Sequence, residues 1–310
     1  MSLSVDLTAR LAAAGLDPGG VESVVRNAVA EDLAGGVDVT SAATIPADQE
    51  STADFVARAP GVVAGLPVAE AVLELVSQDS GAVSGFTPRV LDGTRVGRGD
   101  VLASVTGRTR DLLTAERTML NLLCHLSGVA TLTRRWVDAV AGTRAAVRDT
   151  RKTTPGLRAL EKYAVRCGGG VNHRMSLSDA ALVKDNHVVA AGGVAPAFAA
   201  VRSMWPALPV EVEVDTLSQL DEVLAAGADL VLLDNMDVDT TRAAVERTAG
   251  RARLEASGGL TLDTAAAVAS TGVDYLSVGA LTHSAPVLDI ALDLRPTRGL
   301  RQAPDPREGG

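Results

Sequence analysis

The chain has 310 residues, a formal net charge of −9 and a sequence pI near 5.0. This acidic balance argues against nucleic acid or an anionic membrane surface as its main partner. Aromatic residues make up only 2% of the chain and apolar residues 46%, so we expect a core of alanine, valine and leucine.

The first half of the chain predicts a mixture of helices and strands. Helical spacing of apolar residues predicts helices over 3–14, 20–33 and 66–78. Short β-rich runs predict strands at 53–57 and 101–106. A long amphipathic segment follows at 112–140, and we expect it to break near Gly128. These elements predict a sandwich-like N-terminal α+β domain over 1–125.

From residue 145 onward, β-rich runs alternate with helical stretches such as 216–227 and 261–272. The runs are AAVRD, ALVKDN, VEVEVD, DLVLLDN, RLEASGG and YLSVGA. Repeated β-then-α units predict a parallel sheet with helices outside. Six clear strands, or seven if one forms near 171, fall short of the eight of a complete barrel. We therefore predict an incomplete, open α/β barrel over 126–283.

The end of the chain predicts two further parts. We expect the segment 284–297 to pack back on the N-terminal domain. The composition of 298–310 predicts a disordered tail. The N-terminus shows no signal peptide, and no uncharged run is long enough to span a bilayer, so we expect a cytoplasmic protein.

Polar residues occur at the same place in successive units, at the end of an apolar run. They are Lys184, Glu213, Asp234 and Ser257. With Gly279, the last three recur at intervals of 21, 23 and 22 residues, about one βα unit each. The carboxyl ends of parallel strands form the face where ligands bind. One or two such polar residues could simply mark where a strand emerges into solvent. Because all of them occupy the same position in successive units, we expect them to form a common site.

Two glycine turns predict a phosphate site. Ser257-Gly258-Gly259 precedes the predicted helix at 261, where backbone N–H groups and the helix N-terminus favour an anion. Gly279-Ala280 marks the next strand end, and the last two βα loops of such barrels often bind phosphate. A sugar phosphate or a nucleotide is therefore the expected ligand.

The stretch 148–184 gathers eight Lys/Arg against three Asp/Glu and holds all three lysines of the chain. We interpret Arg158, Lys162 and Arg166 as the solvated face of a helix over 155–167. The remaining cations are expected to form a wall that binds an anionic ligand, because buried unpaired charges are costly. This wall comprises Arg151, Lys152, His173, Arg174 and Lys184. Glu213 and Asp234 suit Mg²⁺, sugar hydroxyls and positive charge on a reacting sugar carbon.

The stretch DTRKTTPGLRALEKYAVRCGGGVNHRMSLSDAALVKDNH, residues 149–187, resembles the signature of the quinolinate phosphoribosyltransferase family. The resemblance continues through LTAERTMLNLLCHLSGVAT, EVEVD, VLLDNM, LEASGGL and VDYLSVGALTHSAPVLDI, and covers nearly all of 20–295. One departure is EDLAGGVDVTS at 31–41, where the family usually has a tighter EDLG-x-GD-x-T. We expect a small local insertion there, away from the chemistry.

The resemblance implies an enzyme of NAD biosynthesis. Members of the family join quinolinate to phosphoribosyl pyrophosphate with Mg²⁺ and give nicotinate mononucleotide, pyrophosphate and carbon dioxide. The implied catalytic residues are Lys152, Lys184, Glu213 and Asp234. The implied quinolinate ligands are Arg151, His173, Arg174 and Lys184, with Lys152 between quinolinate and the diphosphate. Glu213 and Asp234 would position ribose and Mg²⁺. The 5′-phosphate would bind at Ser257, Gly258, Gly259, Gly279 and Ala280, and Thr150 and Val278 complete the substrate-binding set.

The resemblance also implies an assembly. The family's counterpart of Arg117 enters the site of the neighbouring subunit, which predicts a homodimer or a hexamer made as a trimer of dimers. No nucleic acid or membrane partner is expected.

Three other functions are compatible with the residues. A Schiff-base lyase would use Lys184 or Lys152 as nucleophile. A non-catalytic sensor would bind the sugar phosphate without releasing pyrophosphate. A phosphoribosyltransferase relative would act on another acid.

Overall fold

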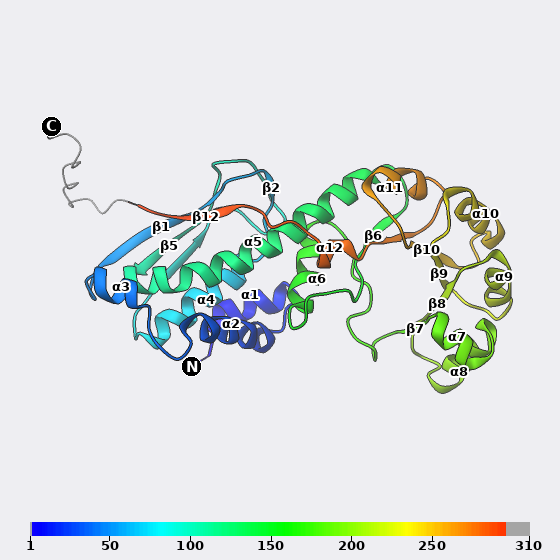
Figure 1. Cartoon of the computed structure of the whole chain (residues 1–310), viewed down its shortest axis with the longest axis horizontal. Helices are drawn as coiled ribbons and strands as arrows, with labels where there is room; N and C mark the ends of the chain where they lie inside the picture. Colours follow the sequence, from blue (N-terminus) through cyan, green and yellow to red (C-terminus); the bar gives the residue numbers. More distant parts are fainter. Residues whose placement is uncertain (1, 296–310) are drawn as a thin grey trace. The chain divides into compact units, whose positions relative to one another are not determined.

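The computed structural model describes residues 2–295, which form two compact units (Figure 1). Unit 1 contains the residues up to Pro60, Gly65–Cys124 and the described residues from Leu288 onward. Unit 2 contains Gly61–Ala64 and His125–Val287. The predicted tail at 298–310 lies outside the described residues. None of the described helices combines the length and apolar character that a bilayer crossing requires.

Unit 1 is built on a four-stranded antiparallel sheet in the order β12-β1-β5-β3. Its strands are β1 (Glu50–Ala57), β3 (Gly85–Pro88), β5 (Val101–Arg108) and β12 (Ile290–Leu294), with a short β4 (Arg95–Val96) nearby in the chain. Alternation along β1 buries every second side chain, so Ala53, Phe55 and Ala57 lie in the core. Phe55 also packs against Phe86 of β3, with ring centroids 6.1 Å apart.

Three helices of unit 1 agree with the predicted ones: α1 (Val5–Ala13), α2 (Pro18–Leu33) and α4 (Leu66–Asp79). The short α3 (Val39–Thr44) was not predicted. Asp17 caps α2 by accepting a hydrogen bond from the N–H of Gly20, and proline occupies the first turn. Helix α4 packs against α1, α2 and β5 and buries most of its apolar residues.

Unit 2 is built on a six-stranded parallel sheet in the order β6-β11-β10-β9-β8-β7. Its strands are β6 (Ala146–Arg148), β7 (Ala181–Val183), β8 (Val210–Val214), β9 (Leu230–Asp234), β10 (Arg253–Ser257) and β11 (Tyr275–Ser277), and a short β2 (Gly61–Val62) also belongs to this unit. Strands β6 and β7 are the two edges, so the barrel is incomplete, as predicted. Near residue 171 there is only an isolated bridge between Val171 and Arg148.

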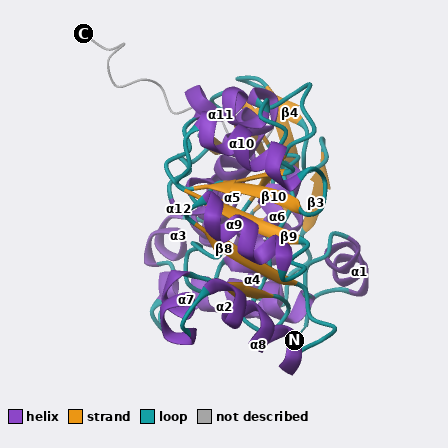
Figure 2. Ribbon diagram, turned by 90° about the vertical axis from the view of Figure 1, so that its right-hand side faces the viewer, coloured by secondary structure: helices purple, strands orange, loops and turns teal. Residues whose placement is uncertain are grey.

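Helices cover the outside of the parallel sheet. They are α6 (Arg158–Cys167), α7 (Asp185–Ala191), α8 (Val194–Met204), α9 (Leu217–Ala225), α10 (Val238–Thr248), α11 (Leu262–Ala269) and α12 (Ala280–His283). Helices α8 to α11 pack on one another in chain order. Figure 2 shows α9 in front of β8, β9 and β10. Because every strand is parallel, all six carboxyl ends meet at one edge of the sheet.

The predicted break near Gly128 is wrong. Helix α5 runs without interruption over Thr109–Ala139. A Cβ atom at Gly128 would lie 2.2 Å from the carbonyl oxygen of Pro286 and 2.9 Å from the Cα of Val287. The glycine therefore allows the chain at 286–287 to cross the helix in close contact, and it does not end the helix.

The prediction that α6 presents three cations to solvent is correct only for Arg166, which is exposed. Lys162 is 0% exposed and pairs with Asp149. Arg158 is half-buried and donates hydrogen bonds to Thr153 Oγ1 (3.0 Å) and to the carbonyl of Met175 (3.1 Å). The helical period places Lys162 on the buried face of α6, and Asp149, directly after β6, supplies its counter-charge.

Candidate functional site

A cavity of about 660 Å³ opens at the carboxyl ends of the parallel strands, which is a typical size for a small-molecule site. Every predicted site residue except Arg117 lines it. These residues are Thr150, Arg151, Lys152, His173, Arg174, Lys184, Glu213, Asp234, Ser257, Gly258, Gly259, Val278, Gly279 and Ala280. Arg117 lies on α5 in unit 1, and its side chain is exposed. The tertiary structure therefore gathers residues that are scattered over 131 positions of the sequence.

Strand periodicity explains this gathering. Side chains two positions apart share one face of a strand, so Glu211 and Glu213 of β8 both point into the barrel. In β10, Glu255 and Ser257 do the same. The residue nearer the carboxyl end lies at the mouth of the cavity and the earlier one lies beneath it. Thus Glu213 and Ser257 are only partly buried, while Glu211 and Glu255 are 3% and 0% exposed.

Sequence reasoning missed several lining residues. They are Leu182, Leu232, Asn235, Glu255, Leu260, Ser277 and His283. For Leu182, Leu232, Glu255 and Ser277 the signal was present, because each stands two positions before a predicted site residue. His283 lies one helical turn after Gly279, so helical spacing from the glycine turn was its signal.

The cationic wall contains two guanidinium groups that crowd one another. Burial lowers the pKa of Arg174 from its usual value, and the nearby charge of Arg151 lowers it further. Arg174 Nη1 donates to the carbonyl oxygen of Ala180 at 2.9 Å. The Nε of Arg151 is buried and has no hydrogen-bond partner among the described residues. A buried N–H without an acceptor is unfavourable, so this wall favours an anionic ligand.

The two predicted lysines of the site lie at its mouth. The side chain of Lys184 is 50% exposed, and its Nζ lies 3.8 Å from Glu213 Oε2. Lys152 is exposed, but its backbone is held in place. Its N–H donates to Thr150 Oγ1 at 3.0 Å, and its carbonyl accepts from Thr282 Oγ1 at 2.8 Å. Both ammonium groups can therefore reach a ligand while their chain segments stay fixed.

Glu213 and Asp234 form an acidic side of the cavity. Burial raises the pKa of Glu213, Lys184 opposes this shift, and the charge of Asp234 adds to it. Burial and the charge of Asp215 raise the pKa of Asp234. The amide of Asn235 donates to Asp234 Oδ2 at 2.6 Å. These like charges make the acidic side favourable for a cation or for hydroxyl groups.

His173 enters the site as a neutral ring and not as the predicted cation. Its Nδ1 accepts a hydrogen bond from the N–H of Arg174 at 2.6 Å, so the ring proton lies on Nε2, which donates to Glu211 Oε2 at 2.8 Å. Burial lowers the pKa of His173 to about 4. The ring is thus held on both nitrogens.

His173, Glu211 and Glu255 have ligand atoms within 4.8 Å of one another, as a metal site would need. Two contacts argue against a metal there. The proton on His173 Nε2 blocks the nitrogen that would coordinate, and Arg148 already donates to Glu255 Oε2 at 2.5 Å. Arg148 also stacks on Tyr275, 4.5 Å from the ring centroid. The cluster is a hydrogen-bonded layer in which His173 and Glu255 also line the cavity.

Two glycine turns complete the cavity. Gly258 and Gly259 have φ values of 83° and 60°, in the left-handed region. A Cβ at Gly258 would lie 2.2 Å from Asn235 Oδ1, so only glycine fits. Helix α11 follows, capped by Thr261, whose side chain accepts from the N–H of Thr264 at 3.3 Å. At the other turn, a Cβ at Gly279 would lie 2.9 Å from the Lys152 side chain.

The chain is similar to known proteins over both units. Residues 129–293 match the family "Quinolinate phosphoribosyl transferase, C-terminal domain", and residues 38–127 match the corresponding N-terminal domain. The nicotinate-nucleotide pyrophosphorylase [carboxylating] of Mycobacterium leprae is 57% identical over 275 residues, which cover 87% of this chain and 95% of the relative. A probable enzyme of the same name from Bacillus subtilis is 41% identical over 265 residues, covering 85% and 90%.

Solved structures of proteins with related names superpose closely on this chain. The nicotinate-nucleotide pyrophosphorylase from Francisella tularensis superposes with a TM-score of 0.85 at 38% identity, covering 89% of this chain and 96% of that one. NadC from Streptococcus pyogenes superposes with a TM-score of 0.85 at 40% identity, covering 90% and 98%.

Proposed function

The chain belongs to the quinolinate phosphoribosyltransferase family, and from this membership we propose how the residues of its cavity divide the work. It transfers phosphoribosyl from phosphoribosyl pyrophosphate to quinolinate with decarboxylation, giving nicotinate mononucleotide, pyrophosphate and carbon dioxide. Both substrates are polyanions. The observation that carries the proposal is the unpartnered Nε of Arg151 in a cavity that also holds two glycine turns.

Quinolinate binds on the cationic wall. The two carboxylates are held by Arg151, Arg174 and Lys184, because planar guanidinium groups bind carboxylate at two points. His173 contributes its ring face and its fixed position, since both of its nitrogens already have partners. Thr150 borders this part of the cavity. A dianionic ligand would relieve the repulsion between Arg151 and Arg174 that lowers the pKa of Arg174.

Phosphoribosyl pyrophosphate binds along the glycine turns and the acidic side. The 5′-phosphate accepts hydrogen bonds from the main chain at Ser257–Gly259, where Gly258 and Gly259 are left-handed, and at 278–280, where α12 begins. Lys152 and His283 lie beside Gly279 and face the diphosphate. Glu213 and Asp234 orient the ribose hydroxyls. Each substrate thus has its own charged surface within one cavity.

The chemistry then depends on placement and charge. The pyridine nitrogen attacks the anomeric carbon while the bond between that carbon and the diphosphate oxygen breaks. Positive charge develops on the sugar during this step. Glu213 and Asp234 stabilise that charge. The ring nitrogen becomes cationic, so its positive charge stabilises the electron pair that remains on the adjacent ring carbon when the carboxylate leaves as carbon dioxide. A proton then replaces the lost carboxylate. Water exclusion protects the sugar from hydrolysis.

The residues present also fit Mg²⁺. Magnesium is usually bound through one or two carboxylates together with substrate phosphates, and Glu213 and Asp234 supply two carboxylates beside the phosphate turns. The like-charge repulsion that raises the pKa of Glu213 would be relieved by a cation. When bound, the ion would neutralise the charge of the leaving diphosphate. Removal of divalent ions by a chelator is expected to abolish turnover.

Arg117 is proposed to act across a subunit interface in a homodimer or a hexamer. Its side chain is exposed, and it is not among the residues that line the cavity of its own chain. This placement suits a residue that completes a neighbour's site. We also propose a cytoplasmic location, which fractionation of cells would test.

One assay tests the proposed activity. Carbon dioxide released from quinolinate is expected to depend on both phosphoribosyl pyrophosphate and magnesium. Nicotinic acid is the control acceptor, because it lacks one carboxylate and would leave part of the cationic wall unpaired. We expect a loss in kcat/KM on the order of 10⁴-fold with nicotinic acid. Pyrophosphate release compares the two acids, because nicotinic acid lacks the carboxylate that leaves as carbon dioxide. Equal rates would show that the cationic wall does not select for the second carboxylate.

Substitution of Gly258 tests the phosphate turn. Gly258→Ala is expected to raise the KM for phosphoribosyl pyrophosphate, because a Cβ at a φ of 83° displaces Asn235 and the turn. The KM for quinolinate should change less. Gly250→Ala is the matched control, since it also has a positive φ but meets nothing within 4 Å. Unchanged phosphoribosyl pyrophosphate kinetics in a folded Gly258→Ala protein would contradict the assignment.

A further inference from the structure

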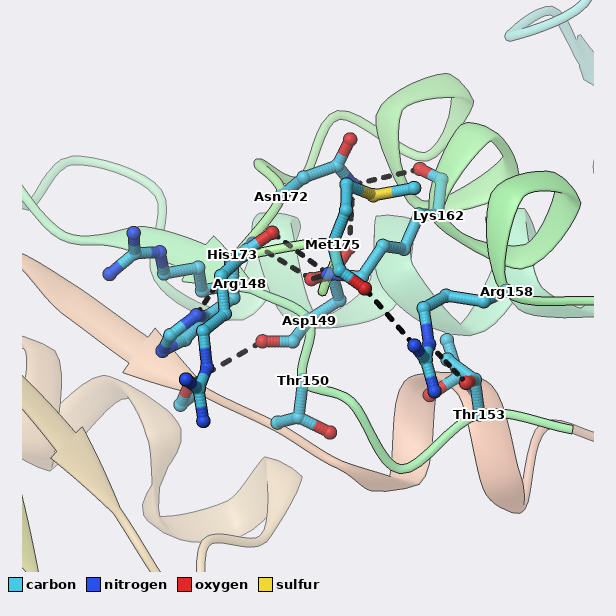
Figure 3. Close-up of polar contacts among 12 residues, drawn as sticks. Arg148, Asp149, Thr150, Thr153, Arg158, Lys162, Asn172, His173 and Met175 are labelled. Carbon is cyan, nitrogen blue, oxygen red and sulfur yellow. Dashed lines mark hydrogen bonds and ion pairs between the residues drawn. The ribbon is translucent and has the colours of Figure 1, made fainter. Parts of the chain in front are cut away.

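A polar group beside His173 does not line the cavity (Figure 3). It consists of the buried Asp149 and Lys162 and the half-buried Asn172. Asp149 and Lys162 are both 0% exposed, and the Lys162 ammonium forms an ion pair with the Asp149 carboxylate. Lys162 also donates a hydrogen bond to the carbonyl oxygen of His173 at 2.9 Å. Figure 3 shows Lys162 extending from its helix toward Asp149 and the main chain of His173.

The same group holds the other side of the His173 main chain. Asp149 Oδ1 accepts a hydrogen bond from the N–H of His173 at 2.8 Å. Asp149 Oδ2 accepts one from the Asn172 amide at 2.5 Å, and that amide also donates to the carbonyl of Lys162 at 2.9 Å. Both main-chain polar groups of His173 are thus held by an ion pair that links β6 to α6.

The free-energy cost of removing these two charges from water offsets much of the attraction between them, so the pair adds little to stability. Burial raises the pKa of Asp149 and lowers the pKa of Lys162, and the attraction between the partners opposes both shifts. Replacement of a buried ion pair by packed apolar residues is often neutral or stabilising. Stability alone therefore does not explain why these two charges lie here. Their directional bonds to one residue of the substrate wall offer a better explanation.

The segment held in this way carries part of the substrate wall. The N–H of Arg174 donates to His173 Nδ1, and the ring of His173 donates to Glu211. A shift of the His173 main chain would therefore turn its ring and move Arg174 relative to Arg151. The guanidinium of Arg174 is held separately by its own hydrogen bond, which it donates to the carbonyl of Ala180.

We propose that Lys162 and Asp149 are positioning residues for quinolinate: they fix the main chain of His173 and, through it, the guanidinium of Arg174. This inference rests on the proposed binding of quinolinate to the cationic wall. Neither residue lines the cavity. Their side chains bind the main chain of His173 and the amide of Asn172, and not the glycine turns. Their loss should therefore affect the two substrates unequally.

The double variant Asp149→Asn/Lys162→Met tests this proposal because it removes both charges together and leaves no buried charge without a partner. The asparagine can still accept from the N–H of His173, but the carbonyl of His173 loses its donor. We expect the KM for quinolinate to rise on the order of 10- to 100-fold. The KM for phosphoribosyl pyrophosphate should stay near its wild-type value. Calorimetric titration with quinolinate should show the same weakening without turnover.

A single variant and a control separate positioning from general loosening. Asp149→Asn alone keeps the bond of Lys162 to the carbonyl of His173 but leaves the Lys162 ammonium buried without a counter-charge. We therefore expect a lower melting temperature together with a smaller rise in the quinolinate KM than in the double variant. Leu160→Ala is the control, because Leu160 is 2% exposed on the same helix and has no part in the polar group. It should lower the melting temperature and leave the quinolinate KM unchanged.

Two results would overturn the proposal. One is a folded double variant, or a folded Asp149→Asn protein, with wild-type quinolinate KM. The other is an equal rise in quinolinate KM in Leu160→Ala, which would make loosening of α6 the cause. Wild-type protein that releases no carbon dioxide from quinolinate would instead refute the proposed activity.

Discussion

Lys184→Ala is expected to lower kcat/KM on the order of 10³-fold, to or below detection, while the protein stays folded. Lys184 directly follows β7 and carries a half-exposed ammonium group at the mouth of the cavity. In the proposed arrangement Lys184 contacts a quinolinate carboxylate, and its Nζ lies 3.8 Å from Glu213 Oε2. An exposed ion pair of this kind contributes little to stability, so the melting temperature should stay near that of the wild type.

Lys184→Arg is the informative comparison. It keeps the charge but replaces a compact ammonium with a planar fork, so it should recover only part of the lost activity. Carbon dioxide release under saturating substrates checks both variants, and circular dichroism checks their fold. A Lys184→Ala enzyme with near-normal kcat/KM would remove Lys184 from the reaction. Activity that is lost only because the protein unfolds would make its role structural.

Arg117→Ala is expected to be inactive as well, although Arg117 does not line the cavity of its own chain. If the arginine completes the site of a neighbouring subunit, its removal leaves a negatively charged substrate group without a partner in every site of the assembly. The loss should be on the order of 10²- to 10³-fold in kcat/KM. Steady-state kinetics measure the loss. Arg108→Ala serves as the control, because Arg108 is a half-buried arginine of unit 1 that donates to the carbonyl of Ser80 and does not line the cavity.

Mixing tests whether Arg117 acts in trans. Arg117→Ala has an intact barrel, and Lys184→Ala has an intact Arg117, so a mixed dimer contains one complete site. With equal amounts and random exchange, about a quarter of wild-type activity should return, because half of the dimers are mixed and each has one working site. No recovery after proven subunit exchange would mean that Arg117 acts within its own chain.

The strands of unit 2 and the members of the site were predictable for one reason. Each parallel strand is an apolar run that ends in a polar residue, and all such ends must meet at one edge of the sheet. Lys184, Glu213, Asp234 and Ser257 could therefore be grouped from the sequence pattern alone. Glu255 could also have been predicted from the sequence, because the two-residue period of a strand places its side chain on the same face as that of Ser257.

Other features could not be predicted from local pattern. Gly128 lies in an uninterrupted helix because the chain at 286–287 crosses it, and nothing within α5 indicates that crossing. The residues next to Lys162 in the sequence are typical of a surface helix, yet its side chain is buried and forms an ion pair with Asp149. The neutral state of His173 depends on burial and on bonds to Arg174 and Glu211.

By itself, the sequence determined the parallel α/β architecture, the family, and which charged residues line the cavity. Periodicity and short motifs are local properties, so they can be read along the chain. Only the tertiary structure decided which charged side chains form ion pairs, which are buried and which lie at the mouth of the cavity. Those properties depend on the distance between residues far apart in the chain, and the energy of a charge depends on its surroundings and not on its neighbours in sequence.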